Sequence, residues 1–184
     1  MNAPITAAGS STASFLRLSS IEITPKQAEK LPLLKEKLVP GSRVFVALID
    51  AGDLAAQIEA VRALKAAGFQ PVPHVRARLV RDEADLRARI KALAEAGSDT
   101  MLVLGGGAPE PIGQYDAAIQ LMQTGVFQAN GVKTLGIAGH PEGNPDITKV
   151  HGEAVLVKAL KEKQAYLKAN GLQGFIATQF LFEA

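Results

Sequence analysis

The chain repeats one local pattern along almost its whole length: a short apolar segment, a polar turn, and a longer segment with the apolar spacing of an amphipathic helix. Four of the helical segments end in Ala-Gly or Asn-Gly shortly before the next apolar segment, at Gly68, Gly97, Gly131 and Gly171. Glycine ends helices in this way because it adopts a positive φ without strain. Repeated units of this kind predict a parallel α/β sheet with right-handed crossovers.

The apolar segments predict six strands, at residues 20–23, 43–49, 70–75, 100–104, 135–138 and 174–180. Helices are expected between them, at about 25–38 with an interruption at Pro32, from 54 to Gly68, from 82 or 85 to Gly97, near 115–124, and at 153–169. The expected N-caps are Thr24, Asp53, either Asp82 or Asp85, and either Asp146 or Thr148. Six units fit a doubly wound sheet, or a (β/α)₈ barrel that lacks its last two units.

Composition excludes several classes of protein. The length of 184 residues suits a single domain, expected at 19–184 behind a disordered lead at 1–18. Lys and Arg total 20, Asp and Glu total 18, and no long block has one sign, so neither nucleic acid nor a membrane surface is an expected partner. No apolar run approaches the ~20 residues of a membrane helix. The absence of Cys favours a cytoplasmic location.

Two glycine-containing turns follow predicted strands, where α/β proteins bind their ligands. Gly105, Gly106 and Gly107 come directly after the fourth strand, and their lack of Cβ atoms allows the backbone to approach a phosphate or a ring. A merely flexible turn is the alternative. The segment 134–146 leads from the fifth strand into a turn that carries His140, Glu142 and Asn144.

Individual polar side chains add further candidates. Glu22 lies in a strand on the face opposite to Ile21 and Ile23, so it is either a general acid in a barrel interior or a solvated carboxylate on an edge strand. Gln179, beside Phe180, either contacts a heterocyclic ligand or is an ordinary hydrogen-bonded polar residue. His74 and His140 lack a third ligand at a characteristic spacing, so a metal is not expected. The charged run 158–163 is expected to be solvated.

Four motifs occur in a fixed order along the chain: Ser-Ile-Glu-Ile-Thr-Pro at 20–25, Pro73-His74, Gly-Ile-Ala-Gly-His-Pro-Glu-Gly-Asn-Pro at 136–145, and Thr-Gln-Phe-Leu-Phe-Glu at 178–183. In this order they resemble the methylenetetrahydrofolate reductase family, from about residue 19 to the last residue. That family is a (β/α)₈ barrel of TIM type with FAD at the carboxyl ends of its strands. It passes hydride from NAD(P)H through the flavin to 5,10-methylenetetrahydrofolate and so forms 5-methyltetrahydrofolate.

The resemblance implies roles for particular residues. Glu22 matches the acid that assists opening of the five-membered folate ring, and Gln179 matches the amide that contacts folate and nicotinamide in turn, with Phe180 beside it. The residues implied to contact FAD are His74, Gly105, Gly106, Gly107, Gly139, His140, Asn144, Pro145 and Lys168.

The chain also departs from the family. The family's fourth strand usually ends in Leu-Arg-Gly-Asp, whereas here Leu104 is followed by three glycines. Only about six βα units are present, so the implied TIM-type barrel is incomplete. The expectation is a shortened member of the family, a fragment, or a chain whose barrel is closed by a second copy or a partner chain. The alternatives to a flavin-dependent reductase are a barrel relative that binds folate or another pterin without redox chemistry, and a subunit that works only with a partner chain.

Overall fold

The structure is a computed structural model that describes residues 19–179, so the expected N-terminal lead at 1–18 and Phe180 lie outside the described residues. A single six-stranded sheet organises this part of the chain. Its strands are β1 (Ile21–Ile23), β2 (Arg43–Val46), β3 (Gln70–Arg76), β4 (Thr100–Leu104), β5 (Thr134–Gly139) and β6 (Gln173–Thr178).

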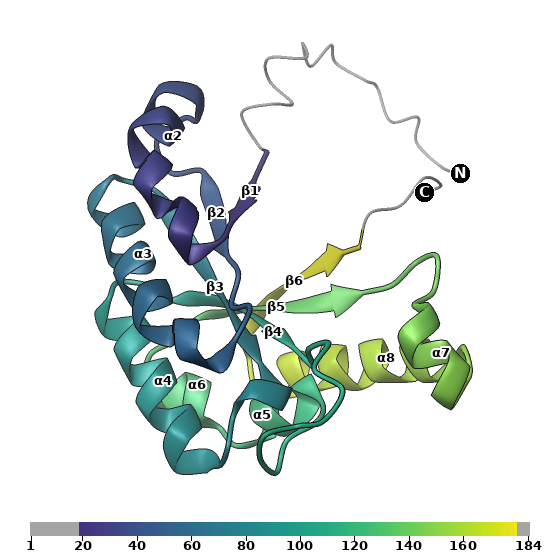
Figure 1. Ribbon diagram of the computed structural model, residues 1–184. Helices are drawn as coiled ribbons and strands as arrows, with labels where there is room; N and C mark the ends of the chain where they lie inside the picture. Colours follow the sequence, from purple (N-terminus) through teal and green to yellow (C-terminus); the bar gives the residue numbers. More distant parts are fainter. Residues whose placement is uncertain (1–18, 180–184) are drawn as a thin grey trace, which may run out of the picture.

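Every neighbouring pair of strands is parallel, and the strand order in the sheet is the order in the sequence. Each crossover therefore advances by one strand in the same direction, and the sheet curls into a half-barrel with helices along its outer face (Figure 1). This arrangement confirms the predicted parallel α/β fold. It is compatible with part of a TIM-type barrel, with β1 and β6 as the two edges of the sheet.

Helical segments connect successive strands. They are η1 (Pro25–Lys30), α2 (Leu31–Lys37), η2 (Ala51–Asp53), α3 (Leu54–Ala66), η3 (Ala77–Leu79), α4 (Glu83–Glu95), α5 (Ala118–Gln123), α6 (Val126–Ala129), α7 (Pro145–His151) and α8 (Ala154–Ala169). The predicted helix-ending glycines are confirmed, since Gly68, Gly97, Gly131 and Gly171 all have φ between +62° and +106°. The interruption of the first helix is also confirmed, because a 3₁₀ segment gives way to α2 next to Pro32.

The helix starts agree with the predicted caps only in part. Asp82 caps α4 by accepting a hydrogen bond from the Asp85 amide at 2.8 Å. The cap expected at Asp146 or Thr148 is wrong, because Asn144 caps α7 and Pro145, with its φ already suited to a helix, starts it. Asp53 precedes α3 but does not cap it, since its carboxylate accepts from the Asp50 amide instead.

Two predicted elements are shorter than expected. β2 ends at Val46, and the apolar residues Ala47 and Leu48 continue as buried chain outside the strand. The helix expected near 115–124 is only α5, and the short helix α6 was not predicted. In both places the apolar residues indicate a buried segment but not its backbone conformation. The reason is that an irregular segment packed against a sheet is as apolar as a strand.

The ladder between β3 and β4 begins only at His74, which pairs with Leu102. The Gln70 amide donates a hydrogen bond to the Ser42 carbonyl on the β2 side. Because successive amides of a strand point to opposite sides, the backbone nitrogens of residues 71 and 73 face β4. Both are prolines and have no N–H to donate. The Ser98 hydroxyl donates to the Pro71 carbonyl at 3.1 Å and partly replaces the missing ladder.

The two faces of the sheet differ in their contents. The outer face carries the hydrophobic core under the helices, with Val44, Val75 and Ile137 among its buried residues. The inner, concave face carries Phe45 and Phe175, together with His74. Because side chains alternate along a strand, this division separates the core residues of β1 and β3 from the candidate site residues Glu22 and His74.

Candidate functional site

An aromatic cluster spans the inner face from β2 to β6. The Phe45 ring lies 6.1 Å from the His74 imidazole and 6.0 Å from the Phe175 ring, both edge to face. The Arg43 guanidinium lies over Phe175 at 5.1 Å from the ring centroid. Gly136 leaves the space for Phe175, since a Cβ at residue 136 would overlap that ring. The curl of the sheet therefore brings the side chains of two strands, far apart in its order, into contact.

His74 and Glu22 meet on this face. His74 Nε2 lies 3.5 Å from Glu22 Oε2, a separation longer than a hydrogen bond. Burial and, as the smaller cause, the nearby Arg76 charge together lower the pKa of His74 to about 4. The imidazole is therefore neutral at pH 7, and its contact with Glu22 is not an ion pair at that pH.

Glu22 is not buried, because its side chain is 59% exposed on the edge strand β1. Of the two environments expected for it, the structure has the solvated carboxylate on an edge strand, so burial within a barrel interior is wrong for this chain as described. The buried member of the pair is His74, whose side chain is 9% exposed.

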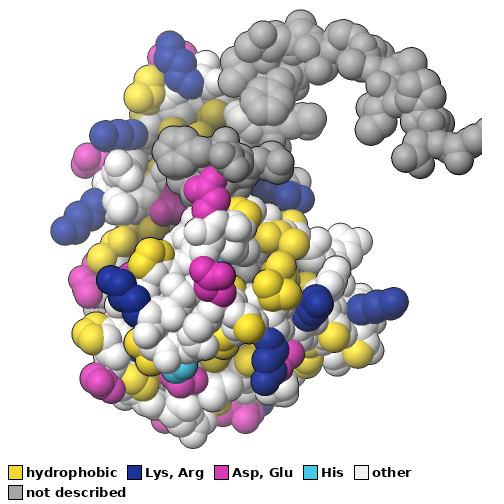
Figure 2. Space-filling model, turned by 90° about the vertical axis from the view of Figure 1, so that its right-hand side faces the viewer, with side chains coloured by type: hydrophobic (Ala, Val, Ile, Leu, Met, Phe, Trp, Pro, Cys, Tyr) yellow, Lys and Arg dark blue, Asp and Glu magenta, His cyan; other side chains and the backbone are white. Residues whose placement is uncertain are grey.

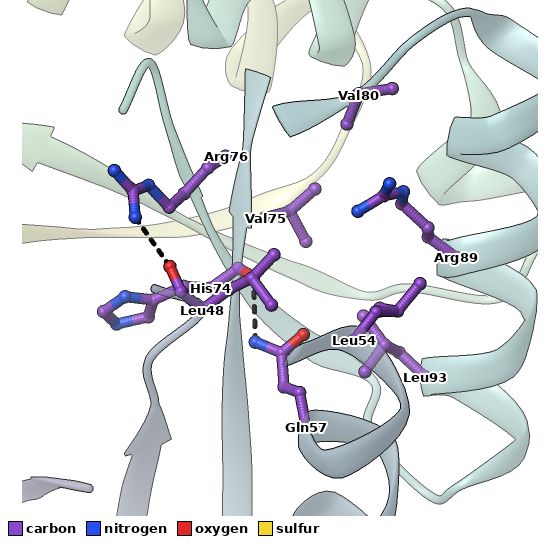
Figure 3. Close-up of a pocket in the computed structure, with 9 residues that line it drawn as sticks. All are labelled: Leu48, Leu54, Gln57, His74, Val75, Arg76, Val80, Arg89 and Leu93. Atoms are coloured by element: carbon purple, nitrogen blue, oxygen red, sulfur yellow. Dashed lines mark hydrogen bonds between the residues drawn. The ribbon is translucent and has the colours of Figure 1, made fainter. Parts of the chain in front are cut away.

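Arg76 lies above the three-glycine turn that follows β4. It is two residues beyond His74 and so on the same face of β3, and its Nη1 donates to the carbonyls of Leu48 and Ile49, both at 2.7 Å (the first bond is drawn in Figure 3). A Cβ at Gly106, where φ is +101°, would lie 3.1 Å from Arg76 Nε. None of the sequence motifs includes this arginine. Its position on the same strand face as His74 was the available signal.

The loop 105–117 is held in place by a second arginine. Arg78 donates from its amide to the Gly105 carbonyl at 3.0 Å and from Nη1 to the carbonyls of Ala108 and Pro109 at 2.8 and 2.9 Å. Farther along, Gly113 packs so closely on the Arg81 backbone that a Cβ would overlap it. The glycine turn is therefore the start of a loop whose carbonyls accept hydrogen bonds from Arg78.

A second cationic group lies at the end of β5. Lys163 of α8 is buried and donates from Nζ to the Ala138 carbonyl at 3.1 Å. Burial lowers the pKa of Lys163, and burial followed by the Lys163 charge lowers the pKa of His140. The expectation that the whole run 158–163 is solvated is wrong at Lys163. The signal was its spacing from Leu160 and Leu167, which places it on the apolar side of the helix.

The other predicted residues are spread over the carboxyl edge and beyond it. Gly139 and Gln179 are joined, since the Gln179 amide donates to the Gly139 carbonyl at 3.2 Å, and strand alternation puts Gln179 on the inner face with Phe175. Asn144 and Pro145 start α7. Lys168 is not brought to this edge. It lines a groove of about 710 Å³ beside Leu167 and Ile176 on the outer face.

The donor set at the carboxyl edge suits negatively charged groups. It consists of the Arg76 guanidinium over a glycine turn, and Lys163 beside His140. Cations and exposed backbone at strand ends bind phosphates, so these residues fit the phosphate part of a dinucleotide such as FAD. The face that the ends of β5 and β6 point to shows both signs of charge interspersed with apolar side chains (Figure 2).

Comparison with models of known protein families finds no match to this chain. Among residues 19–179 there is no group of three or more His, Cys, Asp or Glu side chains that could hold a metal ion. Over the same residues, no helix has the length and apolar character needed to cross a membrane.

Proposed function

We propose that the protein is a flavin-dependent oxidoreductase that reduces 5,10-methylenetetrahydrofolate to 5-methyltetrahydrofolate with NAD(P)H. The observation that carries the proposal is the approach of the Glu22 carboxylate to the neutral His74 imidazole on the inner face. Gln179 lies on the same face, directly after the other edge strand, β6. The ordered motifs that resemble methylenetetrahydrofolate reductase supply the reaction.

Glu22 is proposed to deliver the proton that opens the folate ring. Its exposure leaves it accessible to a substrate that enters the half-barrel, and proton transfer requires a carboxyl group within hydrogen-bond reach of the ring nitrogen. Because His74 is neutral at pH 7, it places no positive charge beside the Glu22 carboxyl group, which lies 3.5 Å from its Nε2. Gln179 offers both an amide donor and an acceptor to a pterin or nicotinamide ring.

The residues that would hold FAD are Arg76 with the Gly105–Gly107 turn, and His140 with Lys163. A bound flavin would supply the two-electron carrier between nicotinamide and folate. In this chain the family's charged pair at the fourth strand is absent, and the positive charge next to the glycine turn comes from β3 through Arg76.

The test is a titration of the full chain with FAD, followed by NADH oxidation in the presence of methylenetetrahydrofolate. We expect flavin absorbance that shifts on binding, and folate-dependent NADH oxidation. Glu22→Gln should lower turnover about 10²- to 10⁴-fold while FAD still binds, because general acid catalysis contributes on that scale. Glu36→Gln, an exposed carboxylate on α2, is the matched control and should leave turnover unchanged. A chain that binds no flavin and shows no turnover would refute the proposal.

A second candidate is a subunit that needs a partner chain, and the open edges of the sheet favour it. β1 and β6 each pair with only one neighbour in the described part of the chain. In that case the activity assay succeeds only after a second chain is added. Folate binding without any NADH-driven turnover would instead support a non-redox pterin-binding relative.

A further inference from the structure

Two buried polar atoms face one small cavity between the outer face of β3 and the helices α3 and α4. Gln57 on α3 is fully buried, and Arg89 on α4 is 7% exposed. Among the described residues, Gln57 Oε1 and Arg89 Nη1 have no hydrogen-bond partner. Both side chains line the cavity and point toward it, with apolar walls from Leu54, Val75 and Leu93 (Figure 3).

The orientation of the Gln57 amide is determined by its other atom. Nε2 donates to the Val46 carbonyl at 2.9 Å and to the His74 carbonyl at 3.0 Å, so a flipped amide would turn its oxygen against two carbonyl oxygens. Oε1 therefore faces the cavity as an acceptor. Arg89 is oriented in a similar way, because its Nε donates to Asp85 Oδ1 at 2.9 Å.

The cavity has a structural cause in the sheet. Pairing between β2 and β3 ends at Val46 and Pro73, and β2 then leaves the sheet. The His74 carbonyl points toward the departed strand, and the Gln57 amide occupies the place of a ladder partner. The cavity lies beneath the point where β2 and β3 separate, because the Gln57 amide group is hydrogen-bonded to the carbonyls of Val46 and His74 and does not fill it.

We propose that this cavity binds one water molecule, which accepts a hydrogen bond from Arg89 Nη1 and donates one to Gln57 Oε1. Positions that the centre of a water molecule can take fill about 10 Å³ of the cavity, which is the size of a single water site. One wall offers a donor and the other an acceptor, and only a molecule that does both satisfies them. A cation would meet the Arg89 charge, and an anion would meet the Gln57 oxygen.

The water joins α3 to α4 directly under the candidate site. Gln57 holds the His74 carbonyl, and Arg89 is anchored through Asp85 at the start of α4, so the bridge connects the backbone of His74 to both helices. Neither Gln57 nor Arg89 reaches the inner face.

The test counts long-lived internal waters by oxygen-17 magnetic relaxation dispersion on the full chain, alongside a high-resolution crystal structure. Arg89→Met should remove one long-lived water relative to the unmodified chain. Arg81→Met is the matched control, because Arg81 approaches the same Asp85 carboxylate at 3.7 Å from the exposed side and does not line the cavity. This control should keep the water.

Electron density for a water between Gln57 Oε1 and Arg89 Nη1 would support the proposal even if Arg89→Met fails to fold. An empty cavity in the crystal, density that refines as chloride, or an equal water count in both variants would overturn it.

Discussion

At the scale of single residues, His74 shows how the fold sets the chemistry of the inner face. Its imidazole is buried beside Phe45, and Arg76 adds a positive charge two residues farther along the strand. Both effects disfavour the imidazolium ion. An imidazole that stays neutral over the whole physiological range cannot act as a pH switch near pH 7.

The first residue-scale prediction concerns stability at acid pH. The pKa of His74 is about 4 in the folded chain, whereas an unperturbed histidine has a pKa of 6.5, so between these values the unfolded chain binds the extra proton. Stability should therefore fall as the pH drops below 6.5, and the full loss of about 3 kcal/mol is reached below pH 4. Urea unfolding of the unmodified chain and of His74→Gln from pH 7 to pH 4 measures this difference. His151→Gln, on the exposed end of α7, should retain the full pH dependence. Equal slopes for the unmodified chain and His74→Gln would contradict the prediction.

A second residue-scale prediction concerns the cation at the end of β5. Because the Lys163 charge adds to burial in lowering the pKa of His140, Lys163→Met should raise that pKa. Lys161→Met changes an exposed lysine on the same helix and should not affect it. An NMR titration of the His140 Cε1 proton measures both variants, and an unchanged value in Lys163→Met would show that Lys163 lies too far away to act on it.

At the scale of elements, the connection from β4 to α5 is the part of the site that sequence patterns describe least well. It is long and contains no strand, yet Arg78 and Arg81 tie it to the chain after β3 through backbone carbonyls and amides. The Gln114 amide donates to the Arg81 carbonyl at 3.0 Å next to Gly113. The position of the glycine turn therefore depends on β3 as well as on β4.

The element-scale prediction tests this attachment. Gly113→Ala should destabilise the protein by about 1–3 kcal/mol, because the added Cβ overlaps the Arg81 backbone and the loop must move. Gly52→Ala is the control, since a Cβ at residue 52 meets no atom within 4 Å. Chemical denaturation compares the two variants. Equal midpoints would mean that the loop moves away from Arg81 at no cost.

At the scale of the whole molecule, the curled sheet of residues 19–179 has β1 and β6 as its two edge strands. β5 and β6 pair along the full length of β6, and on its other side β6 has no partner strand in the described residues. Gln173 and Gln179 donate their amides to β5, so the odd-numbered amides of β6 point inward to the sheet and the even-numbered amides point to the open edge.

This geometry predicts a hydrogen-exchange pattern. In a chain with an open edge, the amides of Gly174, Ile176 and Thr178 should exchange much faster than those of Phe175 and Ala177. Exchange measured by NMR at low and high protein concentration distinguishes a chain whose β6 edge is open from one whose β6 edge is covered by a second copy. Protection of the even-numbered amides that appears only at high concentration would indicate that a second copy covers β6. Protection at all concentrations would contradict an open edge.

The sequence supports prediction of the fold to different degrees at different places. Strand β4 and the end of each predicted helix agree with the structure, because apolar periodicity and glycine termination are local properties. The length of β2 and the break between β3 and β4 were not foreseen in detail, since they depend on where β2 leaves the sheet and on which neighbour the prolines face. The cap at Asn144 was missed because Asp146 and Thr148, farther along the chain, are also good capping residues.

Local patterning by itself determined that this chain forms six parallel strands separated by helices, and it placed Glu22 within the first strand and the glycine turn directly after the fourth. The flavin contact expected of His74 rests on the family resemblance instead. Tertiary structure alone decided which of these groups are buried and which meet. Burial depends on the curl of the sheet, which encloses His74 and leaves Glu22 exposed on an edge strand. The cations Arg76 and Lys163 reach the carboxyl edge of the sheet from two different elements, β3 and α8. Residue spacing within one segment cannot predict a contact between two segments.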